Sequence, residues 1–119
     1  GNSSKNGVWM GFRNASSKYF GKYYLDIRGG ETGGQGQNEH GPPHVHIIEF
    51  KTQKDLGKIY FPKVKDWKKD GSTLKFEGNE VNRKMKKEII KWFNISNLKN
   101  LSSLNQEWLV RNEFNNRTE

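Results

Sequence analysis

The chain has 119 residues, a hydrophobic fraction of 31%, a formal net charge of +8 at pH 7 and no cysteine. This length corresponds to a single domain, and the absence of cysteine excludes a disulfide framework and cysteine-ligated zinc. No apolar run approaches the roughly 20 residues of a membrane span, so we expect a cytoplasmic protein without membrane association. A basic surface favours nucleic acid or an acidic partner protein, although simple solubility of a lysine-rich chain explains the charge equally well.

The N-terminal part of the sequence predicts a tail followed by two strands. Residues 1–7 lack the apolar core of a signal peptide and are expected to form a flexible tail. Residues 8–13 alternate weakly between apolar and polar side chains, and residues 22–28 alternate clearly. With a turn predicted at residues 14–17, the two strands are expected to pair as an antiparallel hairpin.

A glycine-rich segment follows the second strand. Residues 29–38 contain five glycines, which predicts a mobile loop. The segment lacks the Gly-Lys-Ser/Thr ending of a phosphate-binding loop and precedes a strand rather than a helix. Because it runs directly into His40, a flap over the histidines is the better interpretation.

The three histidines of the chain, His40, His44 and His46, fall within seven residues of one another. Pro42 and Pro43 fix an extended backbone between them, and the β-branched residues that follow favour a strand. Side chains alternate along a strand, so His44 and His46 are expected on one face, roughly 6.5 Å apart along the chain. Val45 and Ile47 then point to the opposite face, toward the core.

This cluster suggests a metal or phosphate contact, because imidazole is the commonest metal ligand and titrates near neutrality. His44 and His46 would hold a zinc, manganese or nickel ion, and His40 would fold back as a third ligand. Zinc needs at least three protein ligands, and the sequence does not choose among the further candidates Glu31, Glu39 and Asp55. The alternative is structural: strand histidines are often held by backbone carbonyls.

The motif also carries a family resemblance. Residues 39–46 resemble the signature of a small prokaryotic family, domain of unknown function 4160, in which His-x-Pro-Pro-His-x-His enters a strand. Members continue with strands, an amphipathic helix with a Trp near its end and a second Trp, positions that match Trp92 and Trp108 here. The resemblance covers about residues 20–112, and the glycine-rich loop and an extra lysine-rich segment depart from it.

The resemblance implies an α+β fold and a histidine site, without a settled reaction. Family members often accompany a second small protein in a toxin–antitoxin-like arrangement. Cupins and histidine-triad hydrolases share fragments of the motif less well. The first would place its glutamate later and needs more strands, and the second needs a third histidine in phase with His44 and His46.

The middle of the chain predicts further strands joined by a basic connection. Residues 55–57 predict a turn, and residues 58–62 and 73–77 predict strands, the first ended by proline. Between them, residues 63–71 interleave lysines with Trp67 and end in an Asp-Gly turn signal. Such a segment can contact phosphates and stack a base, or it can be a solvated hairpin whose Trp67 packs on the sheet.

The C-terminal third changes to a helical period. Asn79 is the predicted N-cap of a long helix, with Glu80 in its first turn. Residues 94–97 are expected to end that helix, and Ser103 is the predicted cap of a short final one. The apolar stripe of the long helix comprises Val81, Met85, Ile89, Trp92 and Phe93. The short helix would close the core with Leu104, Trp108 and Phe114.

We therefore predict one α+β domain at residues 8–114 and a frayed end at 115–119. Its antiparallel sheet of four to five strands would pack on one long and one short C-terminal helix. The candidate polyanion-binding residues are Lys63, Lys65, Lys68, Lys69, Lys84, Lys87 and Lys91.

Three functional hypotheses remain open from the sequence. The first is a basic binding module for nucleic acid or an acidic partner. The second is a metal-dependent phosphodiester hydrolase, with His44 and His46 on the ion and His40 completing the site or acting as acid and base. The third is an interaction scaffold with structural histidines. No Ser-His-Asp arrangement or recognisable pair of carboxylates indicates other catalysis.

Overall fold

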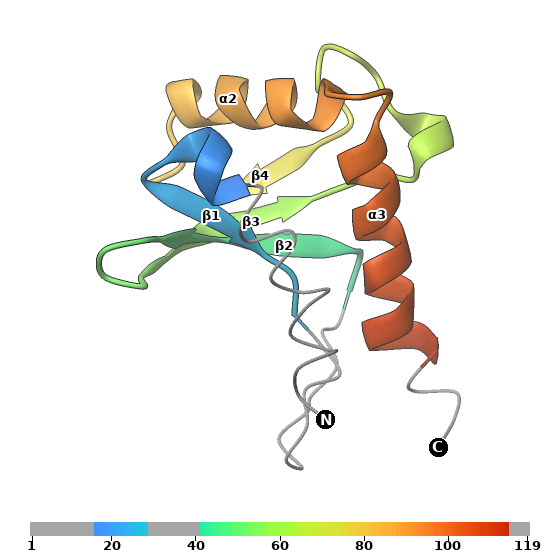
Figure 1. Ribbon diagram of the computed structural model, residues 1–119, viewed down its shortest axis with the longest axis horizontal. Coiled ribbons are helices and arrows are strands. Elements are labelled where there is room, and N and C mark those ends of the chain that lie inside the picture. Colours follow the sequence, from blue (N-terminus) through green and yellow to red (C-terminus); the bar gives the residue numbers. More distant parts are fainter. Residues whose placement is uncertain (1–15, 29–40, 115–119) are drawn as a thin grey trace.

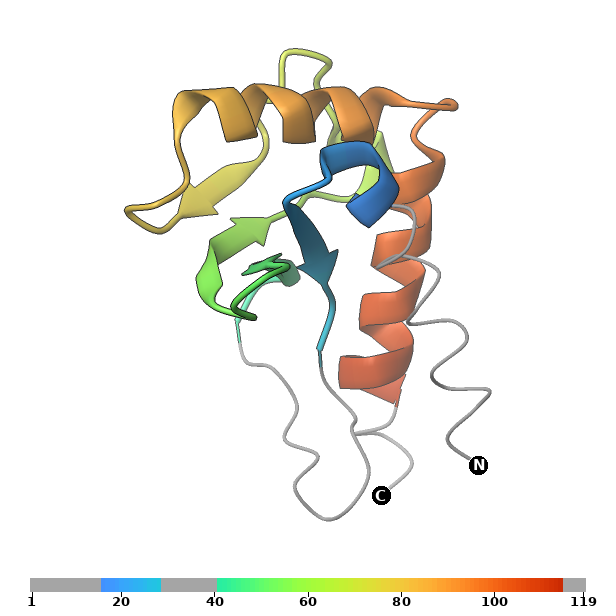
Figure 2. The same cartoon turned by 60° about the vertical axis from the view of Figure 1, so that its left-hand side comes forward.

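The computed structural model describes residues 16–28 and 41–114. They form a four-stranded antiparallel sheet in the order β1-β2-β3-β4, together with helices (Figure 1). Helix α2 lies over one face of the sheet. Helix α3 stands beside the strand ends and runs on past the sheet, as the turned view also shows (Figure 2). The predicted α+β class is thus confirmed.

The strands follow the predicted order, with shifted bounds. β1 is Tyr23–Asp26, β2 is His44–Glu49, β3 is Asp55–Tyr60 and β4 is Lys75–Glu77. The turn between β2 and β3 lies at residues 50–52. The prediction of a turn at residues 55–57 is therefore wrong, because β3 begins two residues after the left-handed Gln53, whose φ is 60°. Asp55 consequently lies in a strand beside β2.

The sheet separates an apolar face from a polar one. Val45 and Ile47 of β2 are fully buried and belong to one core cluster with Ile89 of α2. Alternation along the strand turns His44 and His46 to the opposite face. Leu25 of β1 and Ile59 of β3 join the same cluster, so the side of the sheet toward α2 is apolar across three strands.

Helix α2 comprises Arg83–Asn94. The side chain of Asn82 caps it by accepting the Met85 N–H at 2.9 Å, so the predicted cap at Asn79 is wrong. Residues 79–80 form a turn instead. The predicted apolar stripe is confirmed, since all five of its members are buried: Val81, Met85, Ile89, Trp92 and Phe93.

Helix α3 comprises Lys99–Trp108 and continues as a wider helical turn, η2, at Leu109–Phe114. The predicted start at Ser103 is wrong, because the tight turn before α3 ends at Leu98 and the helix begins at once. Leu104 and Trp108 are buried as predicted. The side chain of Phe114 lies outside the described part of the chain.

The segment before β1 also differs from prediction. Residues 16–20 are helical, so the predicted turn at 14–17 is wrong for its described half. The buried Ser16 hydroxyl explains the helix position, since it accepts the Leu25 N–H at 3.1 Å. The predicted strand at 8–13, the tail at 1–7 and the frayed end at 115–119 lie outside the described residues.

The connection between β3 and β4 is compact rather than a hairpin. It holds a single 3₁₀ turn, η1, at Val64–Asp66, followed by turns. Trp67 packs against Phe93 of α2, with ring centroids 5.6 Å apart. Trp67 therefore packs on α2 rather than on the sheet, where one alternative placed it, and it stays partly exposed. No described helix is long and apolar enough to cross a membrane.

Gly57 lies where β3 closely approaches the end of β4, and a substitution at this position tests that contact. A Cβ at this position would lie 2.1 Å from the Glu77 carbonyl oxygen, and backbone cannot yield as a side chain can. We expect Gly57→Ala to lower the free energy of unfolding by about 3 kcal/mol. Gly21→Ala is the control, because a Cβ there meets nothing within 4 Å; it should cost about 1 kcal/mol through its positive φ alone. Equal losses in denaturant melts would contradict the argument.

Candidate functional site

The face of the sheet turned away from α2 carries a row of four polar residues, one from each strand. Asp26 pairs with His46, and His46 pairs with Lys58. Lys58 in turn pairs with Glu77. Directly paired residues point to the same side with Cβ atoms about 5 Å apart. The order along the row is carboxylate, imidazole, ammonium and carboxylate. Each carboxylate therefore lies beside a group that can donate a hydrogen bond to it.

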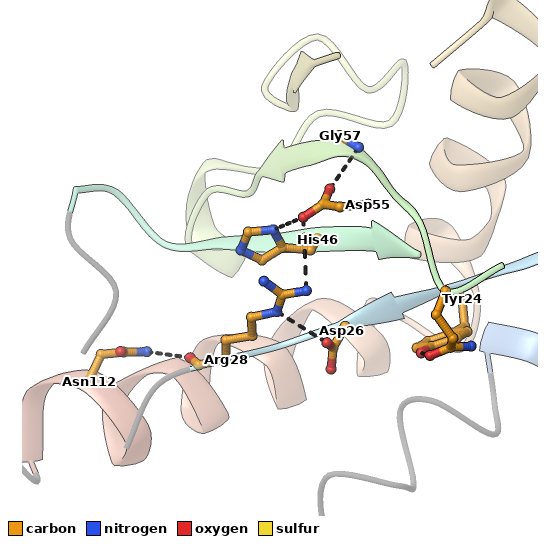
Figure 3. A network of polar contacts seen from close by, with 8 residues as sticks. Tyr24, Asp26, Arg28, His46, Asp55, Gly57 and Asn112 are labelled. Atoms are coloured by element: carbon orange, nitrogen blue, oxygen red, sulfur yellow. Dashed lines mark hydrogen bonds and ion pairs between the residues drawn. The ribbon is translucent and has the colours of Figure 1, made fainter. Parts of the chain in front are cut away.

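His46 is held by a carboxylate and, through it, by a cation (Figure 3). Its Nδ1 lies 2.9 Å from Oδ2 of Asp55. The other oxygen of Asp55 accepts the Gly57 N–H at 3.0 Å, which fixes the carboxylate. Nη2 of Arg28 lies 3.9 Å from the same Oδ2. The side chain of His46 is 7% exposed and that of Asp55 is 43% exposed, so the carboxylate links a buried ring to solvent.

Arg28 joins this network to β1 and to the end of the last helix. Its Nε donates to Oδ2 of Asp26 at 3.2 Å. Its carbonyl oxygen accepts from the amide of Asn112 at 3.0 Å. The buried Asn112 on η2 thus positions the residue that carries the guanidinium. Arg28, which follows β1, therefore links Asn112 of η2 to Asp26 at the end of β1.

His44 has the surroundings of a packed core residue. Its ring centroid lies 5.1 Å from that of Tyr60, 5.1 Å from that of Trp108 and 5.3 Å from that of His46. Its Nδ1 lies 2.8 Å from the carbonyl oxygen of Pro42. The Pro-Pro turn therefore fixes the orientation of the ring, and Trp108 covers it. These contacts are what the structural-histidine hypothesis expects of His44.

The two partners assign the same tautomer to both rings. A carbonyl oxygen only accepts, so Nδ1 of His44 carries the hydrogen. The carboxylate of Asp55, when ionised, requires the same of His46. Each neutral ring then has its lone pair on Nε2. The arrangement at His46 is that of an imidazole oriented by a carboxylate, as in general-base and metal sites.

The structure places the predicted metal ligands as follows. His44 and His46 are neighbours on one face, as alternation predicts, and Asp55 contacts His46 through its carboxylate. His40, Glu31 and Glu39 lie outside the described residues. Within residues 16–28 and 41–114, no three His, Asp or Glu side chains form a group suited to a metal ion. The metal hypothesis therefore stays a prediction that depends on a ligand outside the described residues: His40, Glu31 or Glu39.

The seven predicted polyanion-binding lysines lie elsewhere, on α2 and on the connection between β3 and β4. All seven are exposed, and the described part of the chain gives none of them an ion pair. Lys54 shows the contrast: Glu80 lies 2.8 Å from its ammonium and raises its pKa through a hydrogen bond. Asn94 holds the connection on α2 by donating to the Lys69 carbonyl at 3.0 Å. The two groups of lysines thus adjoin.

Sequence reasoning missed Asp26, Arg28 and Lys58 as members of the histidine network. Asp26 and Arg28 flank Ile27 in a strand with a clear alternation, which already placed both on one face. No local signal places that face beside His46, because the pairing of β1 with β2 spans the loop between them. A comparison with known protein families, curated proteins and solved structures finds no match, so the family resemblance stays a prediction.

The tautomers can be measured. At about pH 9, where unperturbed imidazoles are neutral, long-range proton–nitrogen spectra should show His44 and His46 protonated at Nδ1. Asp55→Ala should release this preference at His46, because the carboxylate is lost. His44 is the internal control, since its acceptor is the Pro42 carbonyl. An unchanged His46 signal in Asp55→Ala would show that another group sets the tautomer.

Proposed function

We propose that this protein is a small basic binding module that recognises nucleic acid through α2 and the lysine-rich connection. The observation that carries the proposal is the charge of α2. Of its 12 residues, five are Lys or Arg and one, Glu88, is acidic. The five cations are Arg83, Lys84, Lys86, Lys87 and Lys91, and all are exposed.

The single carboxylate of α2 does not offset these cations at the outer surface. The hydroxyl of Tyr23 donates to Oε1 of Glu88 at 2.8 Å. Burial and this acceptor raise the pKa of Tyr23 well above its ordinary value, so the hydroxyl stays protonated. Glu88 therefore points back toward β1, while the outward surface of α2 keeps its positive charge.

The cations at the start of α2 also destabilise the helix. Arg83, Lys84 and Lys86 occupy the first turn, which contains no acidic residue. The helix dipole disfavours cations there, at a cost of a few tenths of a kcal/mol each. A helix adjusted for stability alone would carry Asp or Glu in these places. An anionic ligand explains the cost, because it meets both the side-chain charges and the positive end of the dipole.

Lysines of the connection extend this surface. Lys63, Lys65, Lys68 and Lys69 are exposed. A backbone N–H from Ser72 lowers the pKa of Asp70, so this carboxylate stays ionised and offsets part of the charge. Phosphate contacts need several cations that release counterions together, and α2 with the connection supplies them. The family resemblance implies a small partner protein as well. A partner with an acidic surface would bind the same lysines.

A second candidate function uses the histidine face. The contact between His46 and Asp55 supports a hydrolase in which the oriented ring acts as a base or holds a metal ion. The packing of His44 against Trp108 supports the scaffold alternative at the neighbouring ring. The two functions occupy opposite faces of the sheet, so they can be tested separately.

Charge removal tests the nucleic-acid proposal. Lys84→Gln, Lys87→Gln and Lys91→Gln together should weaken binding of a fluorescein-labelled oligonucleotide. They should also reduce the slope of log affinity against log salt by about 2, since each lost phosphate contact removes roughly 0.7. Lys18→Gln, Lys51→Gln and Lys75→Gln remove the same charge outside this surface and form the control; Lys75 pairs with Tyr60, and Tyr60 with His44, so it lies on the face of the sheet turned away from α2.

Two results would contradict the proposal. One is an affinity independent of salt, and the other is an equal loss in both triple variants. Tight binding of polyglutamate in place of the oligonucleotide would point to the acidic partner instead. Fluorescence anisotropy at several salt concentrations measures all of these quantities.

Metal uptake tests the second candidate. If the histidines hold an ion, calorimetry of the wild-type protein should detect zinc, manganese or nickel binding. His44→Ala and His46→Ala should each abolish metal binding, because each variant loses one of the nitrogen ligands. Lys58→Ala, a neighbour on the same face, should retain the binding. Absence of metal uptake by the wild-type protein would leave the scaffold role, in which His44→Ala lowers the melting temperature and changes no binding.

A further inference from the structure

A groove lies at the C-terminal end of α2, where the connection meets the turn into α3. It encloses about 560 Å³ and is lined by Trp67, Lys69, Asn94, Asn97 and Leu98. An aromatic ring, a cation and a side-chain amide thus border one space. These are the groups that hold a base and its phosphate in single-stranded nucleic acid, by stacking, charge and hydrogen bonding.

Trp67 is fixed in this groove without being covered. Its indole N–H donates to Oδ1 of Asn94 at 2.8 Å, and its ring packs against Phe93 on one side. Both hydrogens of the Asn94 amide nitrogen are also used, because they donate to the carbonyls of Lys69 and Ile90. Asn94 therefore positions the indole, which remains partly exposed where it lines the groove. A stacking platform that is held before binding loses little entropy on binding.

A strained turn also lines the groove, through Asn97 and Leu98. Ser96, Asn97 and Leu98 are consecutive left-handed residues, with φ of 54°, 54° and 66°. Non-glycine residues pay about 1 kcal/mol or more for this conformation, and such strain concentrates at binding sites. The turn presents Asn97 to the groove, and no hydrogen bond within residues 16–28 and 41–114 engages its amide. The amide is thus available to a ligand.

The groove continues the basic surface of α2. Lys87 and Lys91 lie about 6 Å apart along the helix axis, and Asn94 lies about 4.5 Å further on, from the helical rise of 1.5 Å per residue. Gly71 allows the connection to approach α2 this closely, since a Cβ there would lie 2.5 Å from Ile90. A phosphate backbone that follows Lys87 and Lys91 therefore reaches the groove at Lys69.

We propose that this groove binds one base of a single-stranded nucleic acid, with the base stacked on Trp67 and its edge hydrogen-bonded by Asn97. Lys69 and Lys91 contact the flanking phosphates. The inference rests on the proposed function and narrows it, because a base enclosed in a duplex cannot enter the groove without being unpaired. The ligand class is single-stranded RNA or DNA rather than a duplex.

The experiment compares three probes on the full chain. These are a fluorescein-labelled 20-nucleotide oligo(U), the matching oligo(U)–oligo(A) duplex, and inorganic polyphosphate, which has charge but no bases. Trp67→Leu should weaken oligo(U) binding about 10-fold, and Asn97→Gly should weaken it about 5-fold. Both variants should leave polyphosphate binding unchanged. The wild-type protein should prefer oligo(U) to the duplex.

Asn97→Gly is the decisive variant if Trp67→Leu fails to fold, because glycine readily adopts the left-handed conformation. Ser96→Gly is its matched control, since it changes the same turn but does not line the groove. Oligo(U) binding that both groove variants leave intact would overturn the inference while the basic surface stands. If neither oligo(U) nor polyphosphate binds, the proposed function itself fails, and the inference fails with it.

Discussion

The alternation of side chains along β2 is the constraint on which both faces of this protein depend. Val45 and Ile47 must point to one side to meet Ile89 of α2, and all three are fully buried. A shift of one residue would turn the imidazoles into this apolar core and expose the aliphatic side chains. The burial of Val45 and Ile47 therefore also fixes His44 and His46 on the other face. The histidine site is a consequence of the core.

Burying imidazoles on that second face requires hydrogen-bond partners, and the neighbouring elements supply them. The Pro42 carbonyl serves His44, and the Asp55 carboxylate serves His46. A buried polar group without a partner costs about 1–3 kcal/mol, so these contacts are conditions for the fold as much as for any chemistry. The short turn between β2 and β3 matters here, because it brings Asp55 into the strand beside His46.

The sequence predicted what depends on short-range periodicity. The histidine strand, the strand at β1, the apolar stripe of α2 and the exposed lysines all follow from spacing within one element. The start of α2 was misplaced because Asn79 and Asn82 are both good caps, and only the bond from the Met85 N–H to Asn82 distinguishes them. Contacts between different elements could not be predicted from the sequence. The pairing of Asp26 with His46 depends on the register of β1 and β2 in the sheet. The left-handed turn at Ser96–Leu98 contains no glycine, so no residue type in it predicts this conformation.

The distribution of charge gives the two faces different roles. On the histidine face, the carboxylates of Asp26 and Asp55 meet Arg28, and Lys58 lies between His46 and Glu77, so the charges there largely compensate one another. On α2 and the connection the lysines lack such partners within the described residues. A field that is largely compensated at one face and only partly compensated at the other orients an approaching polyanion before contact. Within the described residues, the exposed positive charge is therefore concentrated on α2 and the connection. A polyanion would arrive at α2 and reach the groove beside Trp67 without passing the histidines.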